Sequence, residues 1–399
     1  MAKRIAIYTS SYPPKSGGIA SAHYNLSSRL QQRHDVRVFT YRDAERAAFP
    51  HVVHGRPWPG MKALFRVVLR KLLRQPLISR NLSHCDAVAD AAAAVVSCNR
   101  ALQRFRPDII ICPDHYLPSL LLKKPPKSRL IWMARNNYLR FTEQPLVPPA
   151  NVIDLLLAHR LERRAVLKAD AVISPSGYML SVFKRTLERE LPMRVAANFV
   201  DQQRVESVQP SDLRSQLQLP SEAPLVYLPS AGVPMKGARY LYEIVRALGS
   251  QGVGGVYVSG TISGDLRHEL LSLAPNVRCF LPGHVAYADN LKHVAACDFT
   301  VSPTLIENLS NALVESILLG VPVVTFDTGG NREIVQPGRT GVVVGHADID
   351  ALICETRDLA KSPTRRSELK FACRLSANEV INTNRIDAVY EEVFEMLCN

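Results

Sequence analysis

The chain has 399 residues, 47% of them apolar, so it is long enough for two globular domains and is not a disordered chain. No apolar run approaches the roughly 18 residues that span a membrane, and the eight scattered cysteines favour buried free thiols in a reducing cytoplasm. Residues 1–200 have 32 Lys and Arg against 13 Asp and Glu, whereas residues 201–399 have 17 against 23. This asymmetry predicts that only the first half meets an anionic surface.

Apolar, β-rich runs alternate with helical patterns along the chain, which is typical of β-α-β units around a parallel sheet. The first run, near the N-terminus, predicts a strand rather than a signal peptide. We expect strands at residues 4–10, 35–41, 108–112, 129–134, 170–176 and 194–199, and, after a polar segment at 201–224, at 225–230, 253–260, 277–283, 298–303, 322–328 and 341–345. The restart predicts an α/β fold with two similar Rossmann-like domains, 1–200 and 201–399, that face each other across a cleft. A final helix near 385–397 is able to pack back on the first domain.

Gly17 and Gly18 follow the first expected strand, in SYPPKSGGIASAHY, and precede a helical pattern. Glycine lets a backbone approach a phosphate or an acceptor closely, and an ordinary turn is the alternative. The pattern is not G-x-G-x-x-G, which argues against a nicotinamide dinucleotide site.

Residues 61–75, MKALFRVVLRKLLRQ, place basic residues at four-residue spacing beside a broad apolar face: Lys62, Arg66, Arg70 and Arg74. Such a helix suits a membrane interface, with its basic side chains on anionic head groups. A core helix with a solvated edge is the alternative. No nucleic-acid-binding module is visible, so we expect no nucleic-acid partner.

The stretch TLIENLSNALVESI (304–317) places Glu307 and Glu315 eight positions apart. On one continuous helix their side chains would differ by about 80° in direction and would not share a face. Asn308, Ser310 and Asn311 are residue types that cap helix N-termini, so the pattern predicts a helix that begins between the two glutamates. A helix start at the end of a parallel strand suits a phosphate group. Spacing alone leaves two solvated surface glutamates as the alternative.

This stretch continues as ENLSNALVESILLGVPVVTFDTGGNREIV, and it accompanies YPPKSGG, LKADAVISPSGYM, VAANFVD and PMKGARYLYEIVRAL. Nearly end to end, the chain resembles the family-4 retaining glycosyltransferases of the GT-B fold. The resemblance implies transfer of a hexose-type sugar from a nucleotide-diphosphate sugar to an acceptor hydroxyl. The expected acceptor is a lipid-linked glycan of bacterial surface polysaccharide, at the inner face of the cytoplasmic membrane. No metal or other cofactor is expected, since lysine and the helix start carry the phosphate charge in that family.

By the same resemblance, Glu307 contacts hydroxyls of the donor sugar, Glu315 holds the ribose, and Lys236 in PMKG contacts the diphosphate. A compact ammonium group at that place would stabilise charge on the leaving group, and a solvated loop lysine is the alternative. The remaining expected donor-binding residues are Asn308, Leu309, Ser310, Asn311, Gly17, Gly18, Gly329 and Gly330.

The chain departs from the family pattern before the lysine of PMKG. Relatives usually carry Arg five residues before this lysine, where this chain has Ala231 after Ser230. The missing phosphate contact supports a second hypothesis, a non-catalytic GT-B protein that binds a sugar nucleotide or acts as a partner subunit.

On the acceptor side, the position of the usual cleft histidine falls on Pro113. His115 therefore either fills that role after a loop shift or is an ordinary loop residue. Arg135, Asn136 and Asn137 stand where relatives often have another histidine, and they are candidates for the acceptor side.

Overall fold

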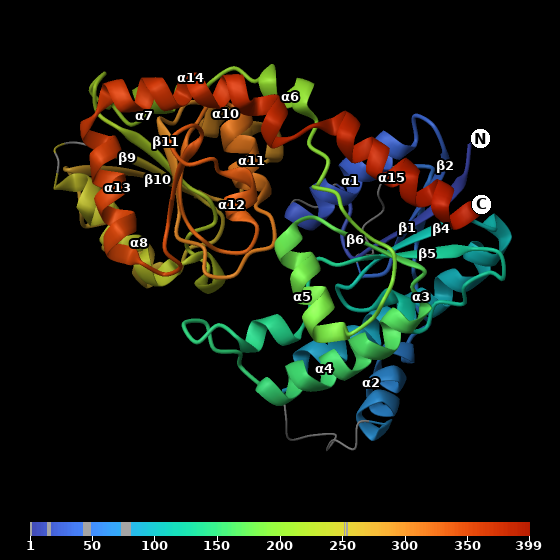
Figure 1. Ribbon diagram of the computed structural model, residues 1–399. Helices are drawn as coiled ribbons and strands as arrows, with labels where there is room; N and C mark the ends of the chain where they lie inside the picture. Colours follow the sequence, from blue (N-terminus) through green and yellow to red (C-terminus); the bar gives the residue numbers. More distant parts are fainter. Residues whose placement is uncertain (1, 14–16, 43–48, 73–80, 251, 253) are drawn as a thin grey trace. The chain divides into compact units, whose positions relative to one another are not determined.

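The protein divides into two compact units, which we describe from a computed structural model (Figure 1). The described residues are 2–13, 17–42, 49–72, 81–250, 252 and 254–399, with the backbone alone at 378. Unit 1 comprises the chain up to Phe199 together with Thr383–Asn399, and unit 2 comprises Val200–Asn382. The last helix, α15 (Thr383–Cys398), therefore belongs to unit 1.

Unit 1 is built on a parallel sheet with the strand order β3-β2-β1-β4-β5-β6-β7. Its strands are β1 (Arg4–Thr9), β2 (Asp35–Thr40), β3 (Val52–His54), β4 (Ile109–Pro113), β5 (Arg129–Met133), β6 (Ala171–Ser174) and β7 (Met193–Val195). The sequence did not predict β3, and it predicted a longer β7 at 194–199. Both are edge strands, and a strand with one neighbour needs only a short paired run, which leaves a weak sequence pattern.

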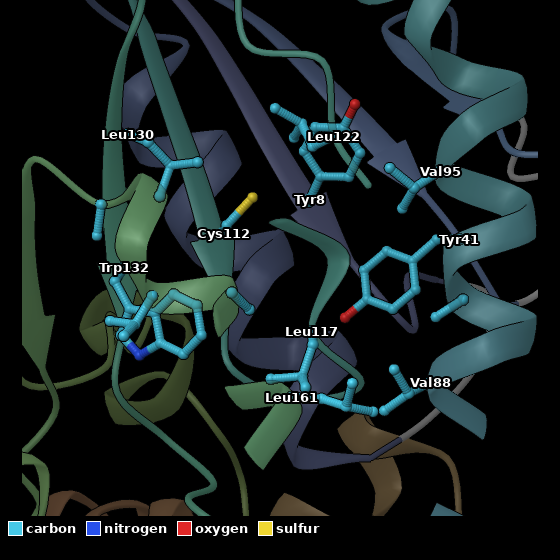
Figure 2. Close-up of a cluster of buried hydrophobic side chains, with 14 of the residues drawn as sticks. Tyr8, Tyr41, Val88, Val95, Cys112, Leu117, Leu122, Leu130, Trp132 and Leu161 are labelled. Carbon is cyan, nitrogen blue, oxygen red and sulfur yellow. The ribbon is translucent and has the colours of Figure 1, made fainter. Parts of the chain in front are cut away.

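The helices of unit 1 cover the sheet because its strands are apolar on both faces. They are α1 (Gly18–Leu30), α2 (Met61–Leu72), α3 (Ser83–Phe105), α4 (Val152–Ala165), α5 (Gly177–Leu187) and α15, with 3₁₀ turns at Pro118–Leu120, Leu139–Thr142 and Val166–Lys168. Figure 2 shows part of the core, where Tyr8, Cys112 and Trp132 of the sheet lie opposite Val88 and Val95 of α3. These side chains are fully buried, so this core holds α3 in a defined place on the sheet.

α15 is attached to the rest of unit 1 by ion pairs. Asp387 is buried, and its Oδ2 accepts hydrogen bonds from Arg29 Nε at 2.9 Å and from Arg29 Nη2 at 2.5 Å. Further along the helix, Glu392 accepts from Arg194 at 2.5 Å, but both of those side chains are largely exposed. The buried contact should therefore contribute much more to docking of α15 than the exposed one.

Unit 2 contains a second parallel sheet, with the order β10-β9-β8-β11-β12-β13. Its strands are β8 (Leu225–Leu228), β9 (Gly254–Ser259), β10 (Val277–Gly283), β11 (Phe299–Ser302), β12 (Val323–Phe326) and β13 (Gly341–Val344). Its helices are α6 (Gln202–Glu206), α7 (Leu213–Gln216), α8 (Ala238–Gly249), α9 (Gly264–Leu271), α10 (Tyr287–Ala295), α11 (Asn311–Leu318), α12 (Asn331–Ile334), α13 (Ile349–Lys361) and α14 (Pro363–Val380), with a 3₁₀ turn, η4, at Pro234–Lys236. The two sheets bear out the predicted pair of Rossmann-like α/β halves.

The polar segment 201–224, for which the sequence predicted no helix or strand, contains α6 and α7. Asp201 caps α6 by accepting a hydrogen bond from Arg204 N at 3.1 Å. Arg214 of α7 pairs with Asp298 at 2.9 Å and donates to several carbonyl groups of the following loop. Local hydrogen bonds, together with one ion pair to a residue distant in the sequence, thus order a segment that has little apolar periodicity of its own.

We predict that Asp387→Asn weakens the docking of α15 by about 1–3 kcal/mol, because a buried charge-assisted contact to Arg29 is lost. Hydrogen exchange of the α15 amides measures this free energy locally. Glu392→Gln is the matched control on the same helix, and its exposed pair should contribute less than about 1 kcal/mol. Equal effects of the two substitutions would contradict the prediction.

Candidate active site

Lys236 and Glu307 lie on two neighbouring loops of unit 2, after β8 and after β11. Backbone hydrogen bonds join these loops, since Leu305 N donates to Met235 O at 2.9 Å. Lys236 Nζ therefore reaches Glu307 Oε2 at 2.5 Å, in an ion pair that is mostly shielded from solvent. The structure brings together the two side chains that the resemblance assigns to the donor phosphate and the donor sugar.

Gly329 and Gly330, after β12, pack directly on the Glu307 loop. Gly330 N donates to Asn308 O at 2.6 Å. Gly329 has a φ of +60°, and a Cβ at this position would meet Glu307 O at 2.2 Å. A side chain here would displace the backbone that positions Glu307, so the close approach requires glycine.

Helix α11 begins at Asn311, directly after the Glu307 loop, where the capping residues predicted it. Ser310 is the N-cap, with an extended backbone, although its side chain makes no capping hydrogen bond. Leu309 and Ser310 are buried. A helix start presents backbone N–H groups and the positive end of the helix dipole, so the stretch from Asn308 to Asn311 is suited to an anion.

Glu315 lies inside α11 and is buried. Its Oε1 accepts a hydrogen bond from the hydroxyl of Tyr287, the first residue of α10, at 3.0 Å. Burial raises the pKa of Glu315 to about 7, although the hydrogen bond from Tyr287 acts in the opposite direction. The guanidinium of Arg204 lies over the Tyr287 ring, 5.5 Å from its centroid. Sequence reasoning missed both residues, because no spacing links Tyr287 or Arg204 to α11.

At the position where the family resemblance implies an arginine, Ala231 is fully buried. The preceding Ser230 has a φ of +51°, and its N–H donates to Ser259 Oγ at 3.3 Å. The loop after β8 is therefore held against the end of β9 by small residues. An arginine at 231 would not fit this packing without a change in the loop.

In unit 1, Gly17 and Gly18 form the start of α1, as the sequence predicted. Gly17 has a φ of +127°, which favours glycine. Among the described residues, no atom would lie within 4 Å of a Cβ on either glycine. Steric contact with the described part of unit 1 therefore does not explain the second glycine. Residues 14–16 of the motif lie outside the described residues.

His115 lies at the carboxyl ends of three adjacent strands. Its Nδ1 is 3.2 Å from Ser10 Oγ after β1, and its carbonyl oxygen accepts from Tyr41 OH, after β2, at 2.7 Å. Burial and the nearby charge of Arg42 lower the pKa of His115 to about 4, so the imidazole is neutral at pH 7. The histidine is therefore in the region that the shifted-loop interpretation requires, as a hydrogen-bonding group and not as a cation.

A second histidine, which sequence reasoning missed, lies close to this region. His23 of α1 is buried and contacts Thr9 Oγ1 at 3.0 Å. Burial lowers its pKa well below the usual value, and the charge of Arg135 acts in the same direction. A lone histidine in a helical pattern carries no signal in the sequence that distinguishes it from a core residue.

The turn at 135–137 is held by Asp114, which is buried. Asp114 Oδ2 accepts from the N–H groups of Arg135, Asn136 and Asn137 at 2.8, 2.7 and 3.2 Å. Burial raises the pKa of Asp114 to about 7. The side chain of Asn137 is itself buried and donates to Thr186 Oγ1 at 2.8 Å. Asn137 therefore serves the fold, whereas Arg135 and Asn136 remain candidates for the acceptor side.

The basic residues of α2 differ from the expected exposed stripe. Arg66 makes a bidentate contact with Asp90 of α3, at 2.8 and 2.5 Å, and Arg70 contacts Asp86 at 2.7 Å. Both arginines are thus bound within unit 1, while Lys62 is exposed. Arg74 lies outside the described residues.

Two general features bear on the kind of site. Among the described residues, no group of three or more His, Cys, Asp and Glu side chains is placed to hold a metal ion. In the part of the chain that the structure describes, every helix is too short or too polar to cross a bilayer.

Comparison with known protein families identifies both halves of the chain. Residues 16–204 match the profile of "Glycosyltransferase Family 4", and residues 224–362 match "Glycosyl transferases group 1".

Two curated relatives match parts of the chain. The lipopolysaccharide core biosynthesis glycosyltransferase LpsE of Rhizobium meliloti is 29% identical over 181 residues, which is 44% of this chain and 50% of LpsE. The GDP-mannose-dependent alpha-(1-6)-phosphatidylinositol monomannoside mannosyltransferase of Mycolicibacterium smegmatis is 35% identical over 94 residues, 24% of each chain. The chain thus spans about half and about a quarter of the lengths of these relatives.

Solved structures match over nearly the whole chain. Sucrose-phosphate synthase of Thermosynechococcus elongatus superimposes with a TM-score of 0.76 at 16% identity, covering 99% of both chains. Alr3699/HepE of Anabaena, solved in complex with UDP, has a TM-score of 0.69 at 18% identity, covering 99% of this chain and 100% of HepE. At these identities the likeness concerns the fold, which is the GT-B fold.

We predict that Glu315→Gln alters the pH dependence of stability. The raised pKa of Glu315 means that the folded state holds a proton that the unfolded state has lost between about pH 4.5 and pH 7. The free energy of unfolding of the wild type is therefore higher below this window, and it falls as the pH rises and Glu315 must ionise in its buried place. Glutamine does not ionise, so the variant should gain up to about 3 kcal/mol over the wild type between about pH 5 and pH 8.

Urea unfolding of both proteins across this pH range measures the difference. Glu269→Gln, on the exposed part of α9, is the control and should follow the wild type at every pH. A constant difference between Glu315→Gln and the wild type would show that Glu315 does not titrate in this window.

Proposed function

Since the chain belongs to the glycosyltransferases of the GT-B fold, we propose that it transfers a sugar from a nucleotide-diphosphate sugar to an acceptor hydroxyl, with retention of the anomeric configuration. Donor recognition is assigned to unit 2 and acceptor recognition to unit 1. The observation that carries the proposal is the ion pair between Lys236 and Glu307 beside the start of α11. A cation, a helix start and a carboxylate at one place match the diphosphate and sugar of such a donor.

In this proposal, the parts of the donor bind to different elements of unit 2. The diphosphate lies across the stretch from Asn308 to Asn311 and contacts Lys236, whose ammonium stabilises the charge that develops on the leaving phosphate. Glu307 accepts hydrogen bonds from sugar hydroxyls, and Glu315 accepts them from the ribose. Tyr287 occupies one oxygen of Glu315 and so orients the carboxyl group.

The relatives support a sugar nucleotide as donor and a lipid-linked glycan as acceptor. HepE was solved with UDP-glucose, and the mycobacterial relative is named for GDP-mannose and for phosphatidylinositol monomannoside. LpsE is named for the lipopolysaccharide core. We therefore propose a lipid-linked glycan of a bacterial surface polysaccharide as acceptor, and a peripheral location on the inner face of the cytoplasmic membrane. The nucleobase and the sugar are left open by these relatives.

We propose that the reaction needs no metal ion, because Lys236 and the helix start supply the positive potential for the diphosphate. Ala231, which is buried, does not supply the phosphate contact that the family resemblance implies for an arginine at this position. This feature favours the second candidate, a non-catalytic protein that binds sugar nucleotides. The two candidates differ in turnover and not in binding.

An assay with a panel of nucleotide sugars and a membrane extract tests the proposed activity. We expect mass-shifted or radiolabelled product with the wild type, and a loss of at least about 100-fold in kcat/KM for Lys236→Ala, since transition-state charge loses its partner. Arg339→Ala is the matched control, because it also removes one cation from unit 2 but from an exposed pair. Donor binding without hydrolysis or transfer on any acceptor would support the non-catalytic candidate instead.

The two glutamates should differ in their kinetic effects. Glu315→Ala loses a ribose contact and should weaken binding of the free nucleoside diphosphate by about 1.5–3 kcal/mol. Glu307→Ala should lower kcat more than it lowers nucleotide affinity, because its contact is to the sugar. Calorimetry with the nucleoside diphosphate, together with steady-state kinetics, separates the two effects. Equal losses of nucleotide affinity in both variants would contradict the assignment.

A further inference from the structure

Helix α2 presents an apolar face away from the rest of unit 1. None of its side chains is buried, and its contacts with α3 include the ion pairs of Arg66 and Arg70. The other side of the helix carries large apolar residues that are between 40% and 71% exposed: Leu64, Val67, Val68 and Leu72. Their spacing places them on one face. A helix that packs in a domain core would turn this face inward, so the exposed face needs another partner.

Helix α4 has an outward stripe of a related kind. Val152, Ile153 and Leu156, in its first half, are between 41% and 48% exposed. The stripe continues with Arg160 and Arg164, which are exposed at positions on the same side of the helix. The exposed surface of α4 is therefore apolar at its start and basic toward its end.

The two helices that carry these apolar faces contact the same end of α3. Arg70, near the end of α2, contacts Asp86 in the first turn of α3 at 2.7 Å. Asp154, in the first turn of α4, accepts from Cys85 N of α3 at 3.0 Å. The end of α2 and the start of α4 thus both contact the first turn of α3. The exposed leucine and valine side chains of both helices belong to one region of unit 1.

The charge that faces solvent around this region is positive. The nearby carboxylates of α3, Asp86 and Asp90, are bound by the two arginines of α2. In the part of the chain that the structure describes, Lys71, Arg160 and Arg164 form no ion pair. Arg163 has one, with the exposed Glu188 at 3.5 Å. Apolar side chains and unpaired cations therefore share the surface.

We propose that the outward faces of α2 and α4 dock unit 1 on an anionic lipid bilayer. The apolar side chains enter the boundary between head groups and acyl chains, and the basic side chains contact lipid phosphates. A bilayer complements both features over two separate helices, which is why we favour it over a second copy of this chain. The role of this docking, access to a lipid-linked acceptor, rests on the proposed function. The docking itself is inferred from the surface of unit 1.

The mode of docking differs from the one that the sequence predicted. The sequence predicts that the basic stripe of residues 61–75, which includes Arg66 and Arg70, faces the lipid head groups. In the structure α3 binds these arginines, and the leucine and valine side chains of α2 face outward in their place. Reversal of Arg66 and Arg70 would therefore disturb the packing of α2, and it is not a clean test of docking.

Co-sedimentation with vesicles tests the proposal without donor or acceptor. With vesicles of equal parts phosphatidylglycerol and phosphatidylcholine, Leu64→Asp with Leu72→Asp, or Val152→Asp with Leu156→Asp, should weaken binding at least about 30-fold. Phe371→Asp with Leu375→Asp is the matched control, because these exposed apolar residues lie on α14 of unit 2. The control pair should bind as the wild type does.

The charged part of the surface has its own control. Arg160→Glu with Arg164→Glu should weaken binding to the anionic vesicles about 30-fold, and binding to pure phosphatidylcholine should change little. Arg246→Glu with Arg357→Glu, which reverses two exposed arginines of unit 2, should have no such effect. Transfer to a short water-soluble acceptor should survive in every variant, so that loss of docking is distinguished from loss of catalysis.

Three results would overturn the proposal. The first is absence of vesicle binding by the folded wild type, and the second is unchanged binding by the aspartate variants of α2 and α4. The third is a lipid-free dimer, seen by sedimentation velocity, that these aspartate variants dissociate. This last result would show that a second copy of the chain covers the apolar faces.

Discussion

Every described strand pairs in parallel with its neighbours, and this arrangement decides where the candidate ligand-binding residues gather. In a parallel sheet all carboxyl ends lie at one edge, and the helices that follow begin there. In unit 2, Lys236, Glu307 and Gly329 follow β8, β11 and β12, which are adjacent in the sheet. In unit 1, Ser10 and His115 follow the adjacent strands β1 and β4. The residues of each group are therefore close together because their strands are neighbours in the sheet, although they are far apart in the sequence.

Each unit buries a carboxyl group near that edge, and the two are compensated differently. Asp114 accepts hydrogen bonds from three backbone N–H groups through Oδ2 and so shapes the turn at 135–137, whereas its buried Oδ1 has no hydrogen-bond partner among the described residues. From the side chains that the structure describes, Glu315 accepts one hydrogen bond, which the Tyr287 hydroxyl donates. Burial raises the pKa of both groups to about 7. A carboxylate has room for several hydrogen bonds, so Glu315 keeps acceptor capacity of the kind that ribose hydroxyls would need, while one oxygen of Asp114 is bound by the turn.

Charge in unit 1 serves two purposes that composition cannot separate. Some of the cations are structural, as when Arg66 and Arg70 bind the carboxylates of α3 and Arg29 binds Asp387 of α15. The pairs of Arg66 and Arg70 join one side of α2 to α3. The remaining exposed cations, among them Lys71 and Arg160, lie beside exposed apolar side chains. The excess of Lys and Arg in the first half therefore overstates the positive charge available to a partner. The positions of the exposed cations say more about a partner than the net charge does.

The sequence by itself determined features whose causes are local. Periodicity and capping residues placed most strands and the start of α11 near Ser310, because these depend on a few adjacent residues. The resemblance to a family named Lys236, Glu307 and Glu315, although no spacing showed that the first two are in contact. Only the tertiary structure placed Tyr287 beside Glu315, His23 beside Thr9, and the arginines of α2 on α3. These contacts join residues from different elements, and their geometry is set by how the elements pack on a sheet, which local sequence patterns do not encode.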